Sequence, residues 1–233
     1  MAQSQFTGPD CNASEMSEWA GRLLDIMVAS IGLIIASPVI ALTALALWIE
    51  GGRPIFFAQR RLGRFGRPFQ IYKFRKFDPA ASGNGPLTVK DDPRLTRVGR
   101  FIEKWKINEL PQLWNVMRGD MSVVGPRPET VNFADCFSPN YLGVLNHKPG
   151  IFGPAQVLFR DEASLYPVGA DTDRFYRETL FPLKASIDLA YFSRRTVLSD
   201  LTWILRGVFA VVAWRCSQDS VSQIMKLREA FAR

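Results

Sequence analysis

Polar and charged side chains cluster between residues 108 and 127, in and beside a predicted helix. Asn108 and Glu109 come just before a stretch whose apolar residues recur at helical spacing, which predicts an amphipathic helix. Asn108 suits the N-cap, because its side-chain oxygen can accept a free N–H of the first turn. Asp120 and Arg127 follow in a segment rich in glycine and proline, which predicts a stiff loop. Since the start of a helix attracts phosphates, the cluster indicates a site for a phosphorylated ligand.

The same cluster belongs to a longer pattern over residues 108–128, which reads NELPQLWNVMRGDMSVVGPRP. This pattern resembles the signature of the bacterial sugar transferases, the monotopic polyprenyl-phosphate phosphoglycosyl transferases. The resemblance extends to Tyr72–Arg75 upstream and to Pro149–Ile151 and Ala155–Val157 downstream. In all, it covers roughly residues 20–215.

The resemblance implies a membrane enzyme. In that family a sugar-1-phosphate passes from a nucleotide diphospho-sugar to undecaprenyl phosphate, as the first step of surface-glycan (exopolysaccharide, capsule or O-antigen) assembly. A carboxylate attacks the phosphorus that carries the sugar and expels the nucleoside monophosphate, and the lipid phosphate then attacks the phosphosugar-enzyme. By this resemblance we expect the nucleotide sugar, undecaprenyl phosphate and membrane lipids as partners, at the cytoplasmic face of the bacterial inner membrane.

This reaction assigns roles to several residues of the chain. Phosphoryl transfer needs positive charge on the phosphate oxygens, and the planar fork of Arg127 can donate two parallel hydrogen bonds to them. A diphosphate normally comes with Mg²⁺, which binds carboxylate oxygens, so we expect Glu109 as the metal ligand. The other expected substrate-binding residues are Lys73, Arg75, Asp120 and Gln156. Lys73 and Arg75 alternate with aromatic residues and therefore share one face of a predicted strand.

Two positions depart from the family pattern. The family usually has Asp at the position of Asn108, where it is understood as the nucleophile, and tends to have Arg at the position of Glu103. Asn108 and Glu109 are the two candidate catalytic positions. A neutral amide cannot act as an anionic nucleophile, so Glu109 is the carboxylate that could take over the attack. Glu109 is displaced from the nucleophile position by one helical step, about 100°. The expected function is a phosphoglycosyl transferase, and the alternative is a catalytically impaired relative that binds nucleotide sugars or acts as a scaffold.

The segment from Ile26 to Ile49 contains 24 residues without a charge, which is long enough for a transmembrane helix. Ser37 and Pro38 stand at its middle, and proline breaks or kinks a helix. The segment is therefore a kinked span or a re-entrant hairpin of two short helices, with a buried core helix as a third alternative. The resemblance implies the re-entrant form, which we expect here. The arginines and lysines within residues 53–76 favour a cytoplasmic location of its C-terminal end.

We expect an α+β, mainly helical fold in four parts. These are a flexible tail at 1–18, a re-entrant helix–break–helix at 19–50, a cytoplasmic catalytic domain at 51–215 and a C-terminal tail at 216–233. Composition predicts strands around 55–57 and 69–72, and a loop at 78–94 that could act as a lid. Helices are expected over 95–106, 181–197, 201–214 and part of 133–148. The N-terminal tail lacks the basic flank and cleavage pattern of a signal peptide.

Composition argues against several other classes of protein. The 47% hydrophobic content supports a packed core, and the net charge of +7 suits anionic partners such as phospholipid or nucleotide sugar. The single histidine, His147, argues against a histidine-based triad or a zinc site. Three scattered cysteines, Cys11, Cys136 and Cys216, show no metal spacing and favour a reducing compartment. Aromatic residues do not alternate with basic ones as in a stacking platform, so no nucleic-acid partner is expected, and a homo-oligomer stays open.

Overall fold

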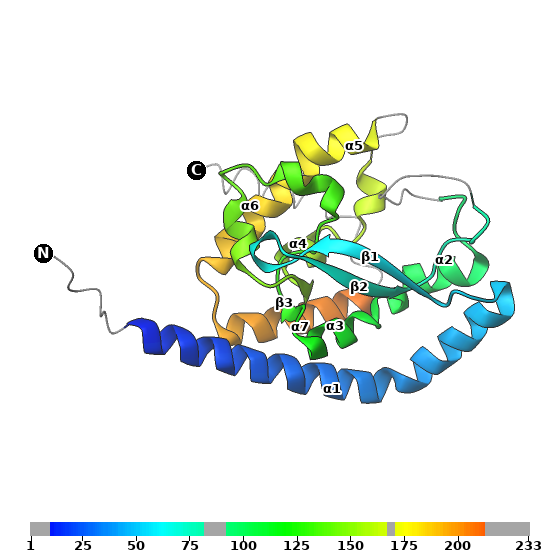
Figure 1. Cartoon of the computed structure of the whole chain (residues 1–233), viewed down its shortest axis with the longest axis horizontal. Coiled ribbons are helices and arrows are strands. Elements are labelled where there is room, and N and C mark those ends of the chain that lie inside the picture. The colour runs from blue at the N-terminus through cyan, green and yellow to red at the C-terminus, as the bar shows by residue number, and fades with distance from the viewer. Residues whose placement is uncertain (1–9, 82–91, 167–170, 213–233) are drawn as a thin grey trace, which may run out of the picture.

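The computed structural model describes residues 10–81, 92–166 and 171–212 and has the mainly helical α+β fold that was expected (Figure 1). Two small sheets, β1–β2 and β3–β4, lie among the helices. One long helix passes beneath the rest of the molecule, which lies on its concave side. The helices and strands are α1 (Asp10–Gly51), β1 (Phe56–Leu62), β2 (Pro68–Phe74), α2 (Arg97–Lys104), α3 (Gln112–Arg118), β3 (Ser122–Val124), β4 (Gly150–Phe152), α4 (Pro154–Leu158), α5 (Thr172–Phe175), α6 (Phe181–Phe192) and α7 (Val197–Val212).

The helix α1 continues through Pro38, where the sequence predicted an interruption. Proline has no N–H, so the carbonyl of Ile34, four residues earlier, loses its usual helical partner. The hydroxyl of Ser37 donates to that carbonyl at 2.8 Å and takes the place of the missing N–H. The helix curves instead of breaking, as Figure 1 shows. The structure therefore differs from the expected helix–break–helix, because a serine hydroxyl replaces the lost hydrogen bond.

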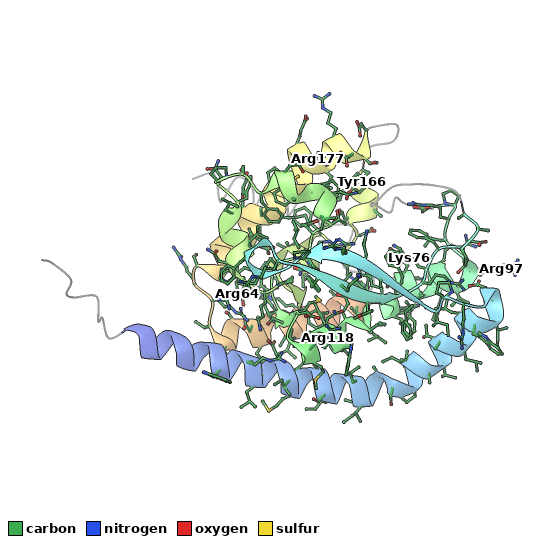
Figure 2. The ribbon with its side chains drawn as sticks, in the orientation of Figure 1. Arg64, Lys76, Arg97, Arg118, Tyr166 and Arg177 are labelled. Carbon is green, nitrogen blue, oxygen red and sulfur yellow. The ribbon has the colours of Figure 1, made fainter. Side chains whose placement is uncertain are left out.

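Much of α1 is apolar and exposed. The stretch Trp19–Gly51, 33 residues long, is long and apolar enough to cross a membrane by length and composition. A few of its residues, such as Ala29 and Leu47, are fully buried against the domain. Figure 2 shows many α1 side chains pointing away from the rest of the molecule. The exposed large apolar residues of α1 are Trp19, Leu23, Ile26, Met27, Ile31, Ile34, Ile35, Val39, Leu42, Leu45, Trp48 and Ile49.

Two charged side chains fix the N-terminal part of α1 to the domain. The guanidinium of Arg22 donates to the carbonyl oxygens of Val116 and Met117, at 2.6 and 2.8 Å. These carbonyls belong to the last turn of α3, which lacks intrahelical partners and favours a cation. The carboxylate of Asp25 accepts from the backbone N–H of Val123 in β3 at 2.7 Å. The start of α1 is thus bound to both α3 and β3.

The C-terminal part of α1 is also bound to the domain. Arg75, which follows β2, donates to the carbonyl oxygens of Leu47 and Gly51, at 3.1 and 3.3 Å, and so satisfies free carbonyls at the end of α1. The carboxylate of Glu50 accepts from the backbone N–H of Val98 in α2 at 3.0 Å. Because Arg22 and Glu50 are both tied to the same domain, the part of α1 between them runs along that domain.

The two strands predicted around 55–57 and 69–72 are confirmed as β1 and β2, which run further than predicted and pair as an antiparallel hairpin. The turn between them includes Phe65 and Gly66 at positive φ, 58° and 71°, and glycine adopts this conformation without strain. Successive residues of a strand face opposite sides, so Ile71 and Lys73 of β2, two residues apart, point to the same side. The hairpin therefore carries a buried apolar residue and a lysine toward the domain together.

The strands β3 and β4 pair in parallel, with Ser122 opposite Gly150. Their backbones approach so closely beyond this pair that a side chain on Gly125 would collide with the carbonyl oxygen of Lys148. Glycine is required at this position for that reason. The close approach carries the loop at residues 125–128 alongside β4 and the start of α4.

The predicted helices are confirmed with shifted ends. The helix expected over 95–106 is α2, and the helix expected over 181–197 is α6, which ends at Phe192. The helix expected over 201–214 is α7, which begins at Val197. Ends of helices depend on capping contacts more than on apolar periodicity, which explains the shifts.

Other segments differ from expectation or fall outside the described ranges. The segment 133–148 contains two short 3₁₀ turns and no α-helix. The helix α1 begins at Asp10, inside the segment 1–18 that was expected to be a loose tail. Residues 82–91 of the expected lid, and residues 213–233, lie outside the described part of the chain.

Asn115 connects α3 to β2 inside the core. Its side chain is fully buried, accepts from the backbone N–H of Tyr72 at 3.0 Å and donates to the carbonyl of Gln70 at 2.7 Å. The amide group therefore pairs with the edge of β2 that faces α3, much as a residue of another strand would. This pairing fixes the distance between the hairpin and the start of α3.

Replacement of Asn115 by alanine tests this connection. Asn115→Ala leaves the N–H of Tyr72 and the carbonyl of Gln70 buried without partners, and we expect the free energy of unfolding to fall by roughly 2–4 kcal/mol. Arg118→Ala, on an exposed part of the same helix, is the control and should change it by less than about 0.5 kcal/mol. Chemical denaturation of the detergent-solubilised protein, followed by tryptophan fluorescence, measures both. Equal stability of Asn115→Ala and the unaltered chain would contradict this role.

Candidate active site

A pocket lies between the β1–β2 hairpin, the start of α3 and the β3–β4 pair. Its lining contains three cations, one carboxylate, two amide side chains and several apolar or backbone groups. The residues are Arg61, Ile71, Lys73, Glu109, Gln112, Arg127, Pro128, Gly150, Ile151 and Gln156. The pocket brings together four residues that the sequence singled out, which are Lys73, Glu109, Arg127 and Gln156.

Lys73 and Glu109 form an ion pair in this pocket. The Nζ atom of Lys73 lies 2.9 Å from Oε1 of Glu109, and the two side chains are 17% and 24% exposed. Burial lowers the pKa of Lys73 to about 8, against the opposing effect of Glu109. Burial would raise the pKa of Glu109, but the charges of Lys73, Lys106 and Arg127 outweigh it and hold this pKa well below its usual range. Glu109 is therefore ionised at neutral pH, and Lys73 is mostly protonated.

Arg61 is a second cation of the pocket, and the sequence did not single it out. Its guanidinium donates to the carbonyl of Pro128 at 3.0 Å and to the side chain of Gln59 at 2.7 Å. Burial lowers the pKa of Arg61 to about 10, and the nearby charge of Arg127 contributes to the fall. In the sequence it is one of several arginines after the apolar segment. Only the strand register separates it from Arg60, which is exposed on the other face of β1.

Arg127 is the third cation, in the loop after β3. Within residues 10–81, 92–166 and 171–212 its guanidinium makes no hydrogen bond or ion pair. Burial would lower the pKa of Arg127, but the carboxylates of Glu162, Glu129 and Glu109 raise it above its usual value. The guanidinium is therefore a stable cation with free donors, which suits the oxygens of a phosphate.

Asn108 is not among the residues that line the pocket, and the N-cap predicted for it was wrong. It lies in a short 3₁₀ turn, Ile107–Glu109, and α3 begins only at Gln112. Pro111 has no N–H to continue the helical pattern from Ile107, which explains the later start. The Asn108 side chain is 4% exposed, and its Oδ1 atom has no hydrogen-bond partner in the described part of the chain.

Two glutamine side chains complete the polar lining. The amide nitrogen of Gln156 donates to the carbonyl oxygens of Gly125 and Gly150, at 2.9 and 3.2 Å, and so holds the loop after β3 against β4. Its Oε1 atom, and Nε2 of Gln112, are buried and have no partner among the residues that the structure describes. Unpaired buried amide atoms are costly, so these two are available to a bound ligand.

Arg75 and Asp120 lie outside the pocket lining. Arg75 caps the end of α1, because β2 ends before it and the chain turns toward that helix. Asp120 lies beyond α3, with one carboxylate oxygen 3.4 Å from Nε of Arg118. Glu103, the second departure from the family pattern, forms an ion pair with Lys76 at 2.5 Å, also outside the lining.

The donors in the pocket fit the expected Mg²⁺ only in part. Among the described residues, no group of three or more histidine, cysteine or acidic side chains could hold a metal ion. Mg²⁺ is commonly held by one or two carboxylates together with substrate phosphates and water. Lys73 contacts Oε1 of Glu109 and leaves Oε2 for such an ion. The arrangement therefore suits an ion that Glu109 shares with a bound diphosphate.

The ion pair predicts a change in the pKa of Lys73. The negative charge of Glu109 raises the pKa of Lys73, whereas burial lowers it. Glu109→Gln removes this charge, so the pKa of Lys73 should fall below its value of about 8. The pH dependence of Lys73 acetylation by acetic anhydride, read by mass spectrometry, measures it. Glu103→Gln, which removes the partner of Lys76, is the matched control and should leave the pKa of Lys73 unchanged. A higher pKa in Glu109→Gln would mean that the two groups do not interact as described.

Comparison with known proteins gives relatives along most of the chain. A protein of Aeromonas hydrophila named UDP-N-acetylgalactosamine-undecaprenyl-phosphate N-acetylgalactosaminephosphotransferase is 38% identical over 188 residues, which are 76% of this chain and 43% of the relative. A UDP-glucose:undecaprenyl-phosphate glucose-1-phosphate transferase of Caulobacter vibrioides is 36% identical over 191 residues, 80% of this chain and 67% of the relative. An undecaprenyl-phosphate galactose phosphotransferase of Salmonella typhimurium is 37% identical over 166 residues, 64% of this chain and 35% of the relative.

The extent of these matches differs between the chain and its relatives. The chain spans less than half the length of the Aeromonas and Salmonella proteins, and about two thirds of the Caulobacter protein. Residues 16–214 match the family model described as bacterial sugar transferase, and this range includes every residue of the pocket. The chain therefore belongs to the bacterial sugar transferase family.

Proposed function

We propose that the chain transfers a sugar-1-phosphate from a nucleotide diphospho-sugar to undecaprenyl phosphate, as the first step of exopolysaccharide, capsule or O-antigen assembly. The observation that carries the proposal is the pocket in which Arg61, Lys73 and Arg127 gather around Glu109. Phosphoryl transfer depends on such positive charge near the phosphate oxygens. The names of the three relatives support the acceptor, because all contain undecaprenyl phosphate, whereas their sugars differ.

Each pocket residue would contact a different part of the nucleotide sugar or its metal ion. Arg127 would bind the diphosphate with two parallel donors, and Lys73 and Arg61 would add positive charge beside it. The free Oε1 atom of Gln156 would accept a hydrogen bond from the bound nucleotide sugar. Glu109 would hold Mg²⁺ together with the phosphates, and a bound Mg²⁺ would neutralise charge on the departing phosphate.

The chemistry exchanges one bond to phosphorus for another. The bond that breaks joins the sugar-bearing phosphorus to an oxygen of the nucleoside monophosphate, which leaves with the electron pair. Asn108 cannot supply the anionic oxygen that would form the new bond to phosphorus. In a two-step transfer Glu109, which is ionised and lines the pocket, is the carboxylate that would form the new bond, and the lipid phosphate would then displace it. In a one-step transfer the lipid phosphate would attack directly.

Asn108 also favours a second candidate function. A chain with a neutral side chain at the position of the family nucleophile could keep the nucleotide-sugar site and lack turnover. Such a protein would act as a nucleotide-sugar-binding protein or scaffold. Binding without formation of a lipid-linked product separates this function from the transferase.

Turnover by the detergent-solubilised full chain tests the proposal. With undecaprenyl phosphate, Mg²⁺ and a panel of nucleotide sugars, we expect the unaltered chain to form a lipid-linked sugar phosphate. Glu109→Gln should lower the rate at least about 100-fold, because it removes the carboxylate of the pocket. Asp135→Asn, an exposed surface change, is the control. If the unaltered chain binds a nucleotide sugar and forms no product, while Asn108→Asp does form it, the scaffold function holds.

We further infer that α1 is embedded in the membrane with both ends at the cytoplasmic side. Its exposed apolar residues suit the acyl region, and hydrogen bonds tie Arg22 and Glu50, which flank its uncharged segment, to one domain. A helix that crossed the bilayer would place Arg22 and Glu50 on opposite sides of a hydrocarbon core about 30 Å thick, where one domain on one side could not bind both. The basic residues after Arg53 favour the cytoplasmic side. This re-entrant arrangement would bring the pocket to the face where the lipid phosphate lies.

Cysteine labelling tests this topology. In a variant without Cys11, Cys136 and Cys216, we expect neither Ala20→Cys nor Arg60→Cys to react with a membrane-impermeant maleimide in intact cells. Both positions are exposed and should react after detergent lysis. A periplasmic cysteine protein in the same cells is the control for labelling. Reaction of Ala20→Cys in intact cells would indicate a true span and exclude the re-entrant arrangement.

A further inference from the structure

A group of buried charges lies outside the pocket lining and has no part in the proposed reaction. We call it the acid–lysine cluster, and it consists of Glu129, Glu162 and Lys184. The Nζ atom of Lys184 lies 2.9 Å from Oε2 of Glu162 and 3.7 Å from Oε1 of Glu129. The side chains of Lys184, Glu129 and Glu162 are 4%, 8% and 16% exposed. Charges so deeply buried are expensive to keep unless they have a function or complete partners.

Two phenols complete the hydrogen bonds of this cluster. The hydroxyl of Tyr166, labelled in Figure 2, donates to Oε1 of Glu162 at 2.9 Å. The hydroxyl of Tyr176 accepts from Lys184 at 3.1 Å. Burial raises the pKa of Tyr176 well above its usual value, so its hydroxyl stays protonated beside the two carboxylates. Both carboxylates therefore have partners other than an arginine.

The cluster nevertheless acts on Arg127. Of the charged groups near this guanidinium, Glu162 stabilises the cation most, and Glu129 follows. A buried arginine near two carboxylates would ordinarily form fork-shaped ion pairs with them. In the described part of the chain the Arg127 guanidinium forms none, and Lys184 holds both carboxylates. The two carboxylates, Glu129 and Glu162, are then balanced in charge by two cations, Lys184 and Arg127. Lys184 contacts the carboxylates, and Arg127 lines the pocket.

The helix α6 also binds the start of α4. Lys184 and Asp188 are four residues apart and lie on the same face of α6. The carboxylate of Asp188 accepts from the backbone N–H of Ala155 in α4 at 3.2 Å. One face of α6 thus holds the start of α4 and, through Lys184, the acids that could bind the Arg127 side chain.

We propose that Lys184 keeps Glu129 and Glu162 from pairing with Arg127 and so leaves the guanidinium free for the phosphates of a nucleotide ligand. Lys184 is then a positioning residue, because it acts through Arg127 and does not touch the ligand. The inference rests on the proposed function, since it takes a nucleotide diphosphate as the ligand of the pocket. Loss of Lys184 should draw Arg127 toward the two acids and away from the pocket.

Titration with UDP and Mg²⁺ tests this inference on the full chain in detergent. Lys184→Met should weaken UDP binding about tenfold, equivalent to about 1.4 kcal/mol. Glu162→Gln removes one competing acid and should bind UDP at least as tightly as the unaltered chain. The double variant Lys184→Met/Glu162→Gln should regain most of the lost affinity. Weaker binding by Glu162→Gln would overturn the inference, because that acid would then hold Arg127 in place. If Lys184→Met does not fold, the UDP affinities of Glu162→Gln and of the double variant still test the inference.

An Arg127→Lys background separates positioning from general damage to the fold. There Lys184→Met should have no further effect on UDP affinity, whereas a structural loss would weaken binding in both backgrounds. Unchanged UDP affinity of Lys184→Met in the native background would overturn the inference and leave the proposed function intact. An unaltered chain that binds neither UDP nor any nucleotide sugar would overturn both.

Discussion

The balance of charge in the pocket is the constraint on which the rest of the structure depends. Arg61, Lys73 and Arg127 share a partly buried space with one carboxylate of the lining, that of Glu109. Burial and mutual repulsion lower the pKa of Lys73 and of Arg61, so the unliganded site is electrostatically unfavourable. An anionic ligand would remove this cost, and groups with strongly shifted pKa values often mark functional sites for that reason.

The remaining elements hold these charges together against their repulsion. The cations come from β1, β2 and the loop after β3, so no single local structure could gather them. Asn115 joins β2 to α3, and Gln156 joins the loop after β3 to β4. Arg22 and Arg75 then bind the N-terminal half and the C-terminal end of α1 to this assembly. These contacts therefore also fix the position of the pocket relative to α1.

The residue types along the chain were enough to predict part of this site. Arg127 was predicted to bind phosphate from its planar guanidinium in a stiff loop, and it lies in the pocket lining. The continuation of α1 through Pro38 could not be predicted, because it depends on the Ser37 hydroxyl, which replaces a helical hydrogen bond. The contacts of Asn108 and Arg75 depend on where neighbouring elements end, which periodicity does not give. Arg61 was missed because only strand register distinguishes it from the exposed arginine beside it.

The central claim is that this pocket binds the diphosphate of a nucleotide sugar. An experimental structure of the chain in a lipid nanodisc, determined with UDP and Mg²⁺, tests it most directly. The account predicts phosphate oxygens within hydrogen-bond distance of the guanidinium of Arg127 and of the ammonium of Lys73, with Glu109 beside the metal ion. A nucleotide bound elsewhere, with Arg127 paired to Glu162 or Glu129, would contradict it.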